Sequence, residues 1–166
     1  MKTAPEILKE ECCPLFNAEK WDEKTLVWDE KPFIKASVPA IFHIPFRKML
    51  GKKITKLMQL AEYQDSLEKD KTDTLLLFND PHPFRSDMYL SVKGKVPKAN
   101  NVHLSGEFIT KVFDGPYRAI PIFIKEMDHQ LQIQQKKAKK YYVHYAYCPK
   151  CAEERGYNYM ILFAET

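Results

Sequence analysis

One order of hydrophobic patterns occurs twice along the chain, and it narrows the possible folds more than any other signal. In each copy, a stretch typical of a strand precedes an amphipathic helical stretch, and two further strand-like runs follow. Each helical stretch has a single apolar stripe, which has to be buried against another element. The two stripes comprise Phe46, Leu50, Ile54, Leu57 and Ala61 in the first copy and Ile120, Phe123, Ile124, Met127 and Leu131 in the second.

This repetition predicts an α+β fold made of two tandem strand–helix–strand–strand modules related by a pseudo-twofold. The modules are expected to share an antiparallel sheet and to place both helices on one face of it. They cover residues 25–97 and 102–166, and the polar residues 1–24 are interpreted as an N-terminal extension. Because 166 residues are typical of one domain, we expect residues 25–166 to form a single domain.

Prolines set the expected limits of several strands. Pro32 and Pro39 are expected to interrupt the first strand, since a proline cannot donate a hydrogen bond to a sheet. The run 79–81 is expected to end the second strand, and the run 148–151 to separate the last two. The predicted strands are 26–44, 74–78 and 88–96 in the first module and 103–113, 141–147 and 157–163 in the second.

Charge and hydropathy argue against several classes of partner. The 26 basic and 22 acidic residues are well mixed and leave a net charge of +4, whereas nucleic-acid-binding proteins gather their basic residues on one face. The basic run 136–140 is interpreted as a solvated helix C-terminus. No apolar run is long enough to cross a membrane, and charged residues occur where a secretory signal would be apolar. We therefore expect a cytoplasmic protein with no nucleic-acid or membrane partner.

Several catalytic motifs are missing from the sequence. Only five glycines are present, which makes a glycine-rich phosphate-binding loop hard to build. There is no serine nucleophile elbow and no His-Glu-x-x-His zinc motif. These observations argue against a nucleotide-dependent enzyme and against a serine hydrolase.

The four cysteines lie in two close pairs, Cys12–Cys13 and Cys148–Cys151. The Cys-Pro-Lys-Cys spacing allows two thiolates to bind one Zn²⁺, which would connect the N-terminal extension to the second module as a structural metal. A redox pair is a weaker alternative because the motif does not lead into a clear helix start, and two reduced, half-buried thiols are the plain alternative. The predicted zinc ligands are Cys13, Cys148 and Cys151, and the sequence does not distinguish Cys12 from Cys13 as the third ligand. The fourth is the other of these two cysteines or, because adjacent cysteines rarely both reach one metal, His144 or His103.

The sequence resembles the GyrI-like small-molecule-binding superfamily. The run 104–117, with its Gly-Pro-Tyr turn, is similar to the entry of that family's second module. A stand-alone bacterial branch, sometimes labelled hydrolase, has similar short motifs: Cys13-Pro14, Trp21, the run 42–45 and the late Cys-Pro-Lys-Cys. The resemblance covers residues 12–166 and implies an aromatic cleft between the modules, with an acidic residue facing a ligand. That acidic residue is often on the strand after the second helix, but here the run 141–147 has no carboxylate.

Glu107 is the nearest candidate for the acidic residue, and together with Tyr117 or Tyr142 it is the predicted catalytic pair. In this hypothesis an apolar cleft raises the pKa of Glu107, which steers water while the phenol donates a proton. The alternative interpretation places Glu107 on the solvent face of its strand, paired with Lys111 or Lys125. The predicted ligand-binding residues are Trp28, His43, Tyr89, Phe113 and Tyr145, although the 21 aromatic residues that make up 13% of the chain also suit an ordinary core.

The resemblance thus implies a protein that binds a small lipophilic or aromatic molecule, and the catalytic hypothesis adds hydrolysis of a reactive electrophile. A non-catalytic sensor or sequestering protein is the first alternative, in which ligand binding yields no product. A zinc-stabilised protein-interaction module is the second, in which the cysteines maintain the fold. The identity of the ligand and the oligomeric state are left open by the sequence.

Overall fold

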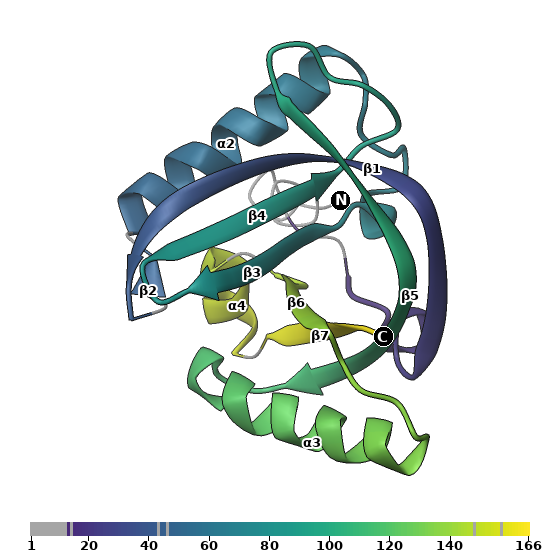
Figure 1. Cartoon of the computed structure of the whole chain (residues 1–166). Helices are drawn as coiled ribbons and strands as arrows, with labels where there is room; N and C mark the ends of the chain where they lie inside the picture. The colour runs from purple at the N-terminus through teal and green to yellow at the C-terminus, as the bar shows by residue number, and fades with distance from the viewer. Residues whose placement is uncertain (1–12, 14, 43, 46, 148, 157) are drawn as a thin grey trace, which may run out of the picture. The chain divides into compact units, whose positions relative to one another are not determined.

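Two compact units make up the computed structural model, which describes residues 13, 15–42, 44–45, 47–147, 149–156 and 158–166 (Figure 1). Unit 2 is the continuous stretch Trp28–Gly106. Unit 1 combines the residues up to Val27 with Glu107–Thr166, so it is built from two separate parts of the chain. Each unit contains its own strands, its own long helix and its own hydrophobic core.

Unit 2 is an antiparallel sheet covered on one face by a long helix. Its middle strand β4 pairs with β1 on one side and with β3 on the other, both antiparallel. Leu90, for example, lies between Ile34 of β1 and Leu76 of β3. The elements are β1 (Lys24–Ile41, which begins in unit 1), β2 (Ile44–Pro45), α2 (Arg47–Tyr63), the 3-10 helix η2 (Lys71–Asp73), β3 (Leu76–His82), β4 (Arg85–Ser91) and the start of β5 (Asn100–Asp114).

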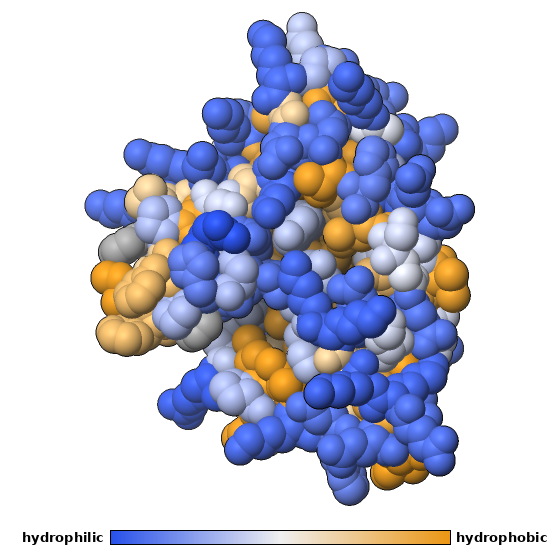
Figure 2. Space-filling view, in the orientation of Figure 1, coloured by the Kyte–Doolittle hydropathy of each residue, from blue (hydrophilic) through white to orange (hydrophobic). Residues whose placement is uncertain are grey.

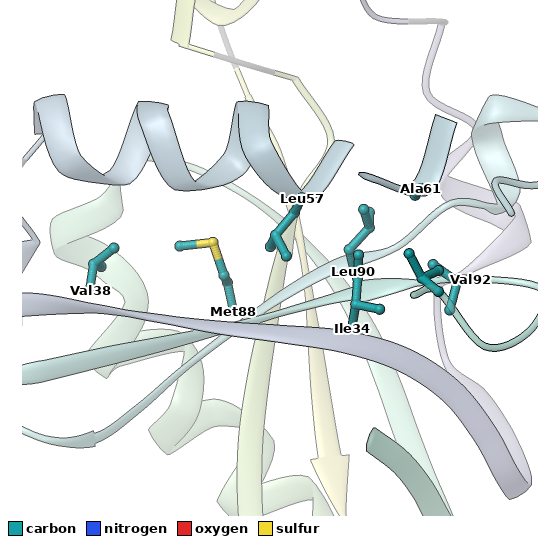
Figure 3. Close-up of a cluster of buried hydrophobic side chains, with 8 residues drawn as sticks. Ile34, Val38, Leu57, Ala61, Met88, Leu90 and Val92 are labelled. Atoms are coloured by element: carbon teal, nitrogen blue, oxygen red, sulfur yellow. The ribbon is translucent and has the colours of Figure 1, made fainter. Parts of the chain in front are cut away.

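The core of unit 2 lies between α2 and the sheet (Figure 3). Leu57 and Ala61, one helical turn apart, project from α2 toward the strands, and they belong to the stripe that the sequence predicts. Alternate residues of β4 and β1 point back at them, among them Met88 and Val38. All four side chains are at most 5% exposed. The apolar face of α2 is therefore the element that organises this core.

Unit 1 contains three antiparallel strands and its own long helix. Its middle strand β7 pairs with β5 on one side and with β6 on the other. Met127 and Leu131 of the helix pack against Phe113, Val143 and other residues of the three strands. The elements are the 3-10 helix η1 (Ala18–Lys20), the remainder of β5, the 3-10 helix η3 (Tyr117–Ala119), α3 (Ile120–Ile133), β6 (Lys140–Tyr145), α4 (Pro149–Arg155) and β7 (Tyr159–Glu165).

The structure confirms the predicted α+β class and the antiparallel strands. In each unit the principal elements follow the order strand, helix, strand, strand. The pseudo-twofold and the placement of both helices on one face stay predictions. Part of the segment interpreted as an extension packs within unit 1, where the Trp21 ring lies 6.2 Å from Phe163 and the Thr110 hydroxyl donates to the Trp21 carbonyl.

The structure tests three local predictions based on proline. Pro32 and Pro39 do not interrupt β1, because Pro32 takes part through its carbonyl, which accepts from the Val92 amide at 3.2 Å. The run 79–81 does not end β3, which continues to His82 through a register shift that leaves Pro81 outside the regular ladder. The break expected between the last two strands is confirmed, and it contains helix α4, since proline suits the first turn of a helix.

On the face of the molecule that Figure 2 shows, hydrophilic residues cover most of the surface. Hydrophobic residues form small separate groups among them, which is normal for a protein surface. Among the described residues, no helix combines the length and the apolar character that spanning a bilayer requires.

Candidate functional site

The sheet of unit 2 has two faces of different character. Ile34, Ala36 and Val38 of β1 face α2, so the residues between them face away from the helix. On this second face, Lys35 pairs with Tyr89 and Ser37 pairs with Asp87 across β1 and β4. Polar and charged side chains therefore gather on the face that α2 leaves uncovered.

A buried carboxylate lies at the centre of this polar group. The Asp87 side chain is only 3% exposed, yet three donors reach it. Ser37 Oγ donates to Oδ1 at 2.5 Å, Arg85 Nε lies 3.1 Å from Oδ1, and Lys35 Nζ lies 3.4 Å from Oδ2. A buried charge is costly unless it is paired in this way. We call Lys35, Ser37, Arg85 and Asp87 the Asp87 site.

Solvent reaches the partners of Asp87 more easily than it reaches Asp87 itself. Ser37 is exposed, and the side chains of Lys35 and Arg85 are 27% and 47% exposed. The site therefore presents a hydroxyl and two cations to solvent, with the carboxylate behind them. Such a convergence of a nucleophilic group, a carboxylate and cations is a recognised pattern of functional sites.

An aromatic row leads from the Asp87 site along the same face. The Lys35 ammonium lies 5.4 Å from the centre of the Tyr89 ring, which makes an edge contact with Phe33 at 6.5 Å. Phe33 in turn lies 5.7 Å from the half-buried Trp28. Trp28 and Tyr89 are two of the predicted ligand-binding residues, and the structure brings them together through Phe33. An apolar wall beside a few fixed polar groups is the usual composition of a small-molecule site.

Sequence reasoning missed Asp87 and Ser37. The strand was expected to start at Met88, which left Asp87 outside it, whereas β4 starts at Arg85. Within a strand, Arg85, Asp87 and Tyr89 alternate with the buried Ser86 and Met88 and share one face. That alternation was the available signal for the site.

The predicted catalytic Glu107 lies in unit 1, in a different setting. Lys136 Nζ contacts its Oε1 at 2.5 Å, and Thr166 Oγ1 donates to the same oxygen at 2.9 Å. These two hydrogen bonds, first that of Lys136 and then that of Thr166, lower the pKa of Glu107. The cation is Lys136 rather than Lys111 or Lys125. The lowered pKa of Glu107 is opposite in direction to the raised pKa that the sequence hypothesis requires.

The structure does not bring Glu107 together with Tyr117 or Tyr142. Glu107 precedes Phe108, which pairs with Glu165 at one end of β7, whereas Tyr145, the partner of Tyr117, pairs with Met160 at the other end. That separation is roughly 20 Å along the strand. Tyr142 is 2% exposed and alternates with β6 residues that face α3. The structure therefore does not bring together the acid–base pair that the sequence predicts.

The remaining aromatic predictions in unit 1 fall into two environments. Tyr117 is 51% exposed and makes an edge contact with Tyr145 at 4.9 Å, so the structure brings this predicted pair together. Phe113 is 7% exposed and stacks on Phe123 at 4.5 Å, which makes it part of the core. Tyr142 lies 6.2 Å from Phe108.

Tyr141, next to Tyr142, is a further tyrosine whose hydroxyl is held by a hydrogen bond. Its hydroxyl donates to Asp128 Oδ1 on α3. Partial burial, reinforced by that hydrogen bond and by the charge of Asp128, raises the pKa of Tyr141 well above its usual range. Tyr141 therefore stays protonated near neutral pH and serves as a link between β6 and α3.

Two of the predicted zinc ligands share one small cluster. Cys13 and Cys151 are both thiols, 7% and 5% exposed, and they pack with Tyr147. The Arg155 guanidinium lies 4.5 Å from the Tyr147 ring and contacts the Cys13 carbonyl at 3.5 Å. The described residues contain no group of three or more potential metal ligands. Cys148 and Cys12, like the predicted ligand-binding residue His43, lie outside the described residues, so the zinc site stays a prediction.

A comparison with known protein families identifies the class of this chain. The family described as bacterial hydrolase matches residues 3–166, almost the whole chain. The chain therefore belongs to that family. No curated protein matches it. The match leaves the GyrI-like resemblance a prediction.

Proposed function

We propose that this protein is a hydrolase that acts on a small, largely apolar molecule at the Asp87 site. One observation carries the proposal: a carboxylate that is 3% exposed lies 2.5 Å from an exposed hydroxyl and between two cations. The description of the family as bacterial hydrolase supports the same reaction class. The ligand class is the one that the sequence predicts, while the catalytic carboxylate moves from Glu107 to Asp87.

The side chains of the site can divide the work of hydrolysis among them. The Asp87 carboxylate accepts a proton from the hydroxyl or water that attacks the substrate. Lys35 and Arg85 stabilise negative charge that develops on the substrate oxygen, because these cations are already in position when the reaction begins. The half-buried Trp28 contacts the apolar part of the molecule, while Phe33 and Tyr89 are buried beside it.

A panel of chromogenic aryl esters and strained-ring electrophiles tests the proposal. We expect the wild-type protein to hydrolyse at least one of them and Asp87→Asn to lower kcat/KM by on the order of 100-fold. Asp29→Asn, which changes an exposed carboxylate on the same strand as Ser37, is the matched control and should retain turnover. Circular dichroism at the assay temperature confirms that each variant is folded.

Two results would count against the proposal. Loss of activity in Glu107→Gln but not in Asp87→Asn would return the catalytic role to Glu107. Saturable binding of the panel members without any product would favour the sensor or sequestering protein instead.

A further inference from the structure

We infer that Ser37 is the nucleophile of the Asp87 site, and that the substrates are therefore activated carboxylic esters or thioesters with an apolar group. This inference rests on the proposed function and names its substrate class. It requires that Ser37 differ in its surroundings from the other serines of the chain.

The five serines of the sequence all lie in unit 2, which allows a direct comparison. Ser66, Ser86 and Ser91 are buried, each at most 7% exposed. Ser105 is exposed, but its Oγ accepts a hydrogen bond from the Glu30 amide at 2.8 Å. Ser37 combines an exposed position with a hydroxyl that donates to a buried carboxylate. That combination is what a serine nucleophile requires.

The direction of the hydrogen bond from Ser37 matters for reactivity. An ionised carboxylate only accepts, so the hydroxyl hydrogen of Ser37 points at Asp87 Oδ1. The lone pairs of Oγ are then directed away from Asp87, and the exposure of Ser37 makes them accessible. The absence of a nucleophile elbow argued against a serine hydrolase, but a strand can also present a hydroxyl beside a carboxylate.

The reaction balances without a cofactor. Ser37 Oγ attacks the carbonyl carbon, and its proton passes to Asp87 and from there to the departing alcohol or thiol as the bond to that group breaks. This step leaves an ester between Ser37 and the acyl group. Water then attacks the acyl carbon and gives a proton to Asp87, the bond to Ser37 Oγ breaks, and that proton returns to Ser37. The products are a carboxylic acid and an alcohol or thiol.

The surroundings of Ser37 favour an uncharged, apolar substrate with a polar carbonyl. Lys35 and Arg85 lie beside Asp87 and favour the negative charge that forms on the carbonyl oxygen during the attack. Phe33 is 0% and Tyr89 5% exposed, so the half-buried Trp28, whose ring lies 5.7 Å from Phe33, is the aromatic residue of the row that offers apolar surface to the rest of the substrate. An aryl or medium-chain acyl ester meets both requirements.

The test combines covalent labelling with turnover. A fluorophosphonate probe and 4-nitrophenyl butyrate are each mixed with the wild-type protein and with Ser37→Ala, Asp87→Asn and Ser105→Ala. We expect intact-mass spectrometry to find one phosphonate per chain, and peptide mapping to place it on Ser37. Ser37→Ala should take up no label and show no turnover, while Asp87→Asn should label about 100-fold more slowly. Ser105→Ala, the matched exposed serine, should behave as wild type.

The outcomes separate this inference from the proposed function. Turnover that persists in Ser37→Ala, or a label on another residue, overturns the inference and leaves hydrolysis at the Asp87 site standing. If strained rings are hydrolysed but esters are not, the inference is likewise overturned and hydrolysis at the Asp87 site still stands. If the protein shows no turnover and no labelling with any probe, both the inference and the proposed function are overturned. Because Ser37 is exposed and Asp87 keeps two cations, Ser37→Ala should fold, and circular dichroism checks this.

Discussion

Asp87 is the residue whose environment differs most from that of an ordinary surface carboxylate. Its 3% exposed side chain has polar contacts with Ser37, Lys35 and Arg85. Both cations are partly exposed, so they can turn toward water if the carboxylate is neutralised. Loss of the charge should therefore cost less than the breaking of a fully buried ion pair.

We expect Asp87→Asn to lower the free energy of unfolding by about 1–3 kcal/mol, because its donors lose a charged acceptor. Urea denaturation followed by circular dichroism measures this change. Asp29→Asn should stay within about 0.5 kcal/mol of wild type, as is usual for exposed sites. Equal effects in the two variants would mean that Asp87 is not held by its partners in solution.

Glu107 gives a pH-dependent prediction with a definite sign. Its pKa is lowered in the folded protein by the hydrogen bonds from Lys136 and Thr166. The stabilisation is therefore fully present above the ordinary pKa of 4.5 and is lost as the pH falls through the lowered folded value. We expect Glu107→Gln to be less stable than wild type at pH 7 and equally stable at the acid end. Thermal unfolding at a series of pH values measures this, and a constant difference at every pH would contradict it.

The sequence identified only part of the candidate site. The assignment of Trp28 and Tyr89 as ligand-binding residues stays a prediction; Tyr89 follows Asp87 on the same face of β4, and Trp28 lies 5.7 Å from Phe33. The alternation along β4 was a signal for Asp87, but its meeting with Ser37 could not be predicted, since it depends on the register between β1 and β4. Glu107 was overvalued because its Lys136 partner, 29 positions away, is brought close only by the fold.

At the scale of the elements, helix α2 contains a glycine that packing does not require. A Cβ on Gly51 would meet no atom within 4 Å, and glycine lowers helix stability. We expect Gly51→Ala to raise the free energy of unfolding by about 0.5–1 kcal/mol. Gly115→Ala is the contrasting control, because its Cβ would lie 2.9 Å from Phe123 Cζ in the stacked pair with Phe113. It should destabilise by about 1–3 kcal/mol. Urea denaturation measures both changes, and a loss of stability in Gly51→Ala would contradict the prediction.

The segment around α4 gives the prediction that concerns metal content. Cys13 and Cys151 share a buried cluster, as a structural zinc would require. We expect native mass spectrometry of the purified protein to show one bound zinc ion, which Cys151→Ser loses. The Cys12→Ser variant should keep the metal if Cys13 is the ligand. A bare polypeptide mass would leave the two thiols as core residues.

The helices and strands were largely predictable because their apolar residues repeat with the period of each element. The stripes that include Leu57 and Met127 lie in α2 and α3. Prolines caused the errors, because a proline limits only its own backbone. Pro32 still joins the sheet through its carbonyl, and β3 continues past Pro81 to His82. Whether a proline interrupts an element depends on whether the sheet or helix needs a hydrogen-bond donor at that position, and the sequence does not reveal this.

Over the described part of the molecule, the core clusters that contain Val38 and Val143 belong to different units. The cluster of Val38 contains only residues of unit 2, and that of Val143 contains only residues of unit 1. We expect Val38→Ala and Val143→Ala each to cost about 1–3 kcal/mol. Their effects should add within about 0.5 kcal/mol in the double variant, because they share no partner. Urea denaturation measures this, and a larger coupling would show that the clusters are not independent.

The division of unit 1 into two chain segments has a consequence for synthesis on the ribosome. Unit 2 is continuous, so all of its residues have emerged before the second part of unit 1 begins. Trp21 and Cys13, in contrast, find Phe163 and Arg155 only when translation is nearly finished. Trp21 and Cys13 therefore lack their contacts of the folded protein while unit 2 is synthesised. A ribosome stalled once Gly106 has left the exit tunnel should carry a nascent chain in which unit 2 already resists protease and the residues before it do not.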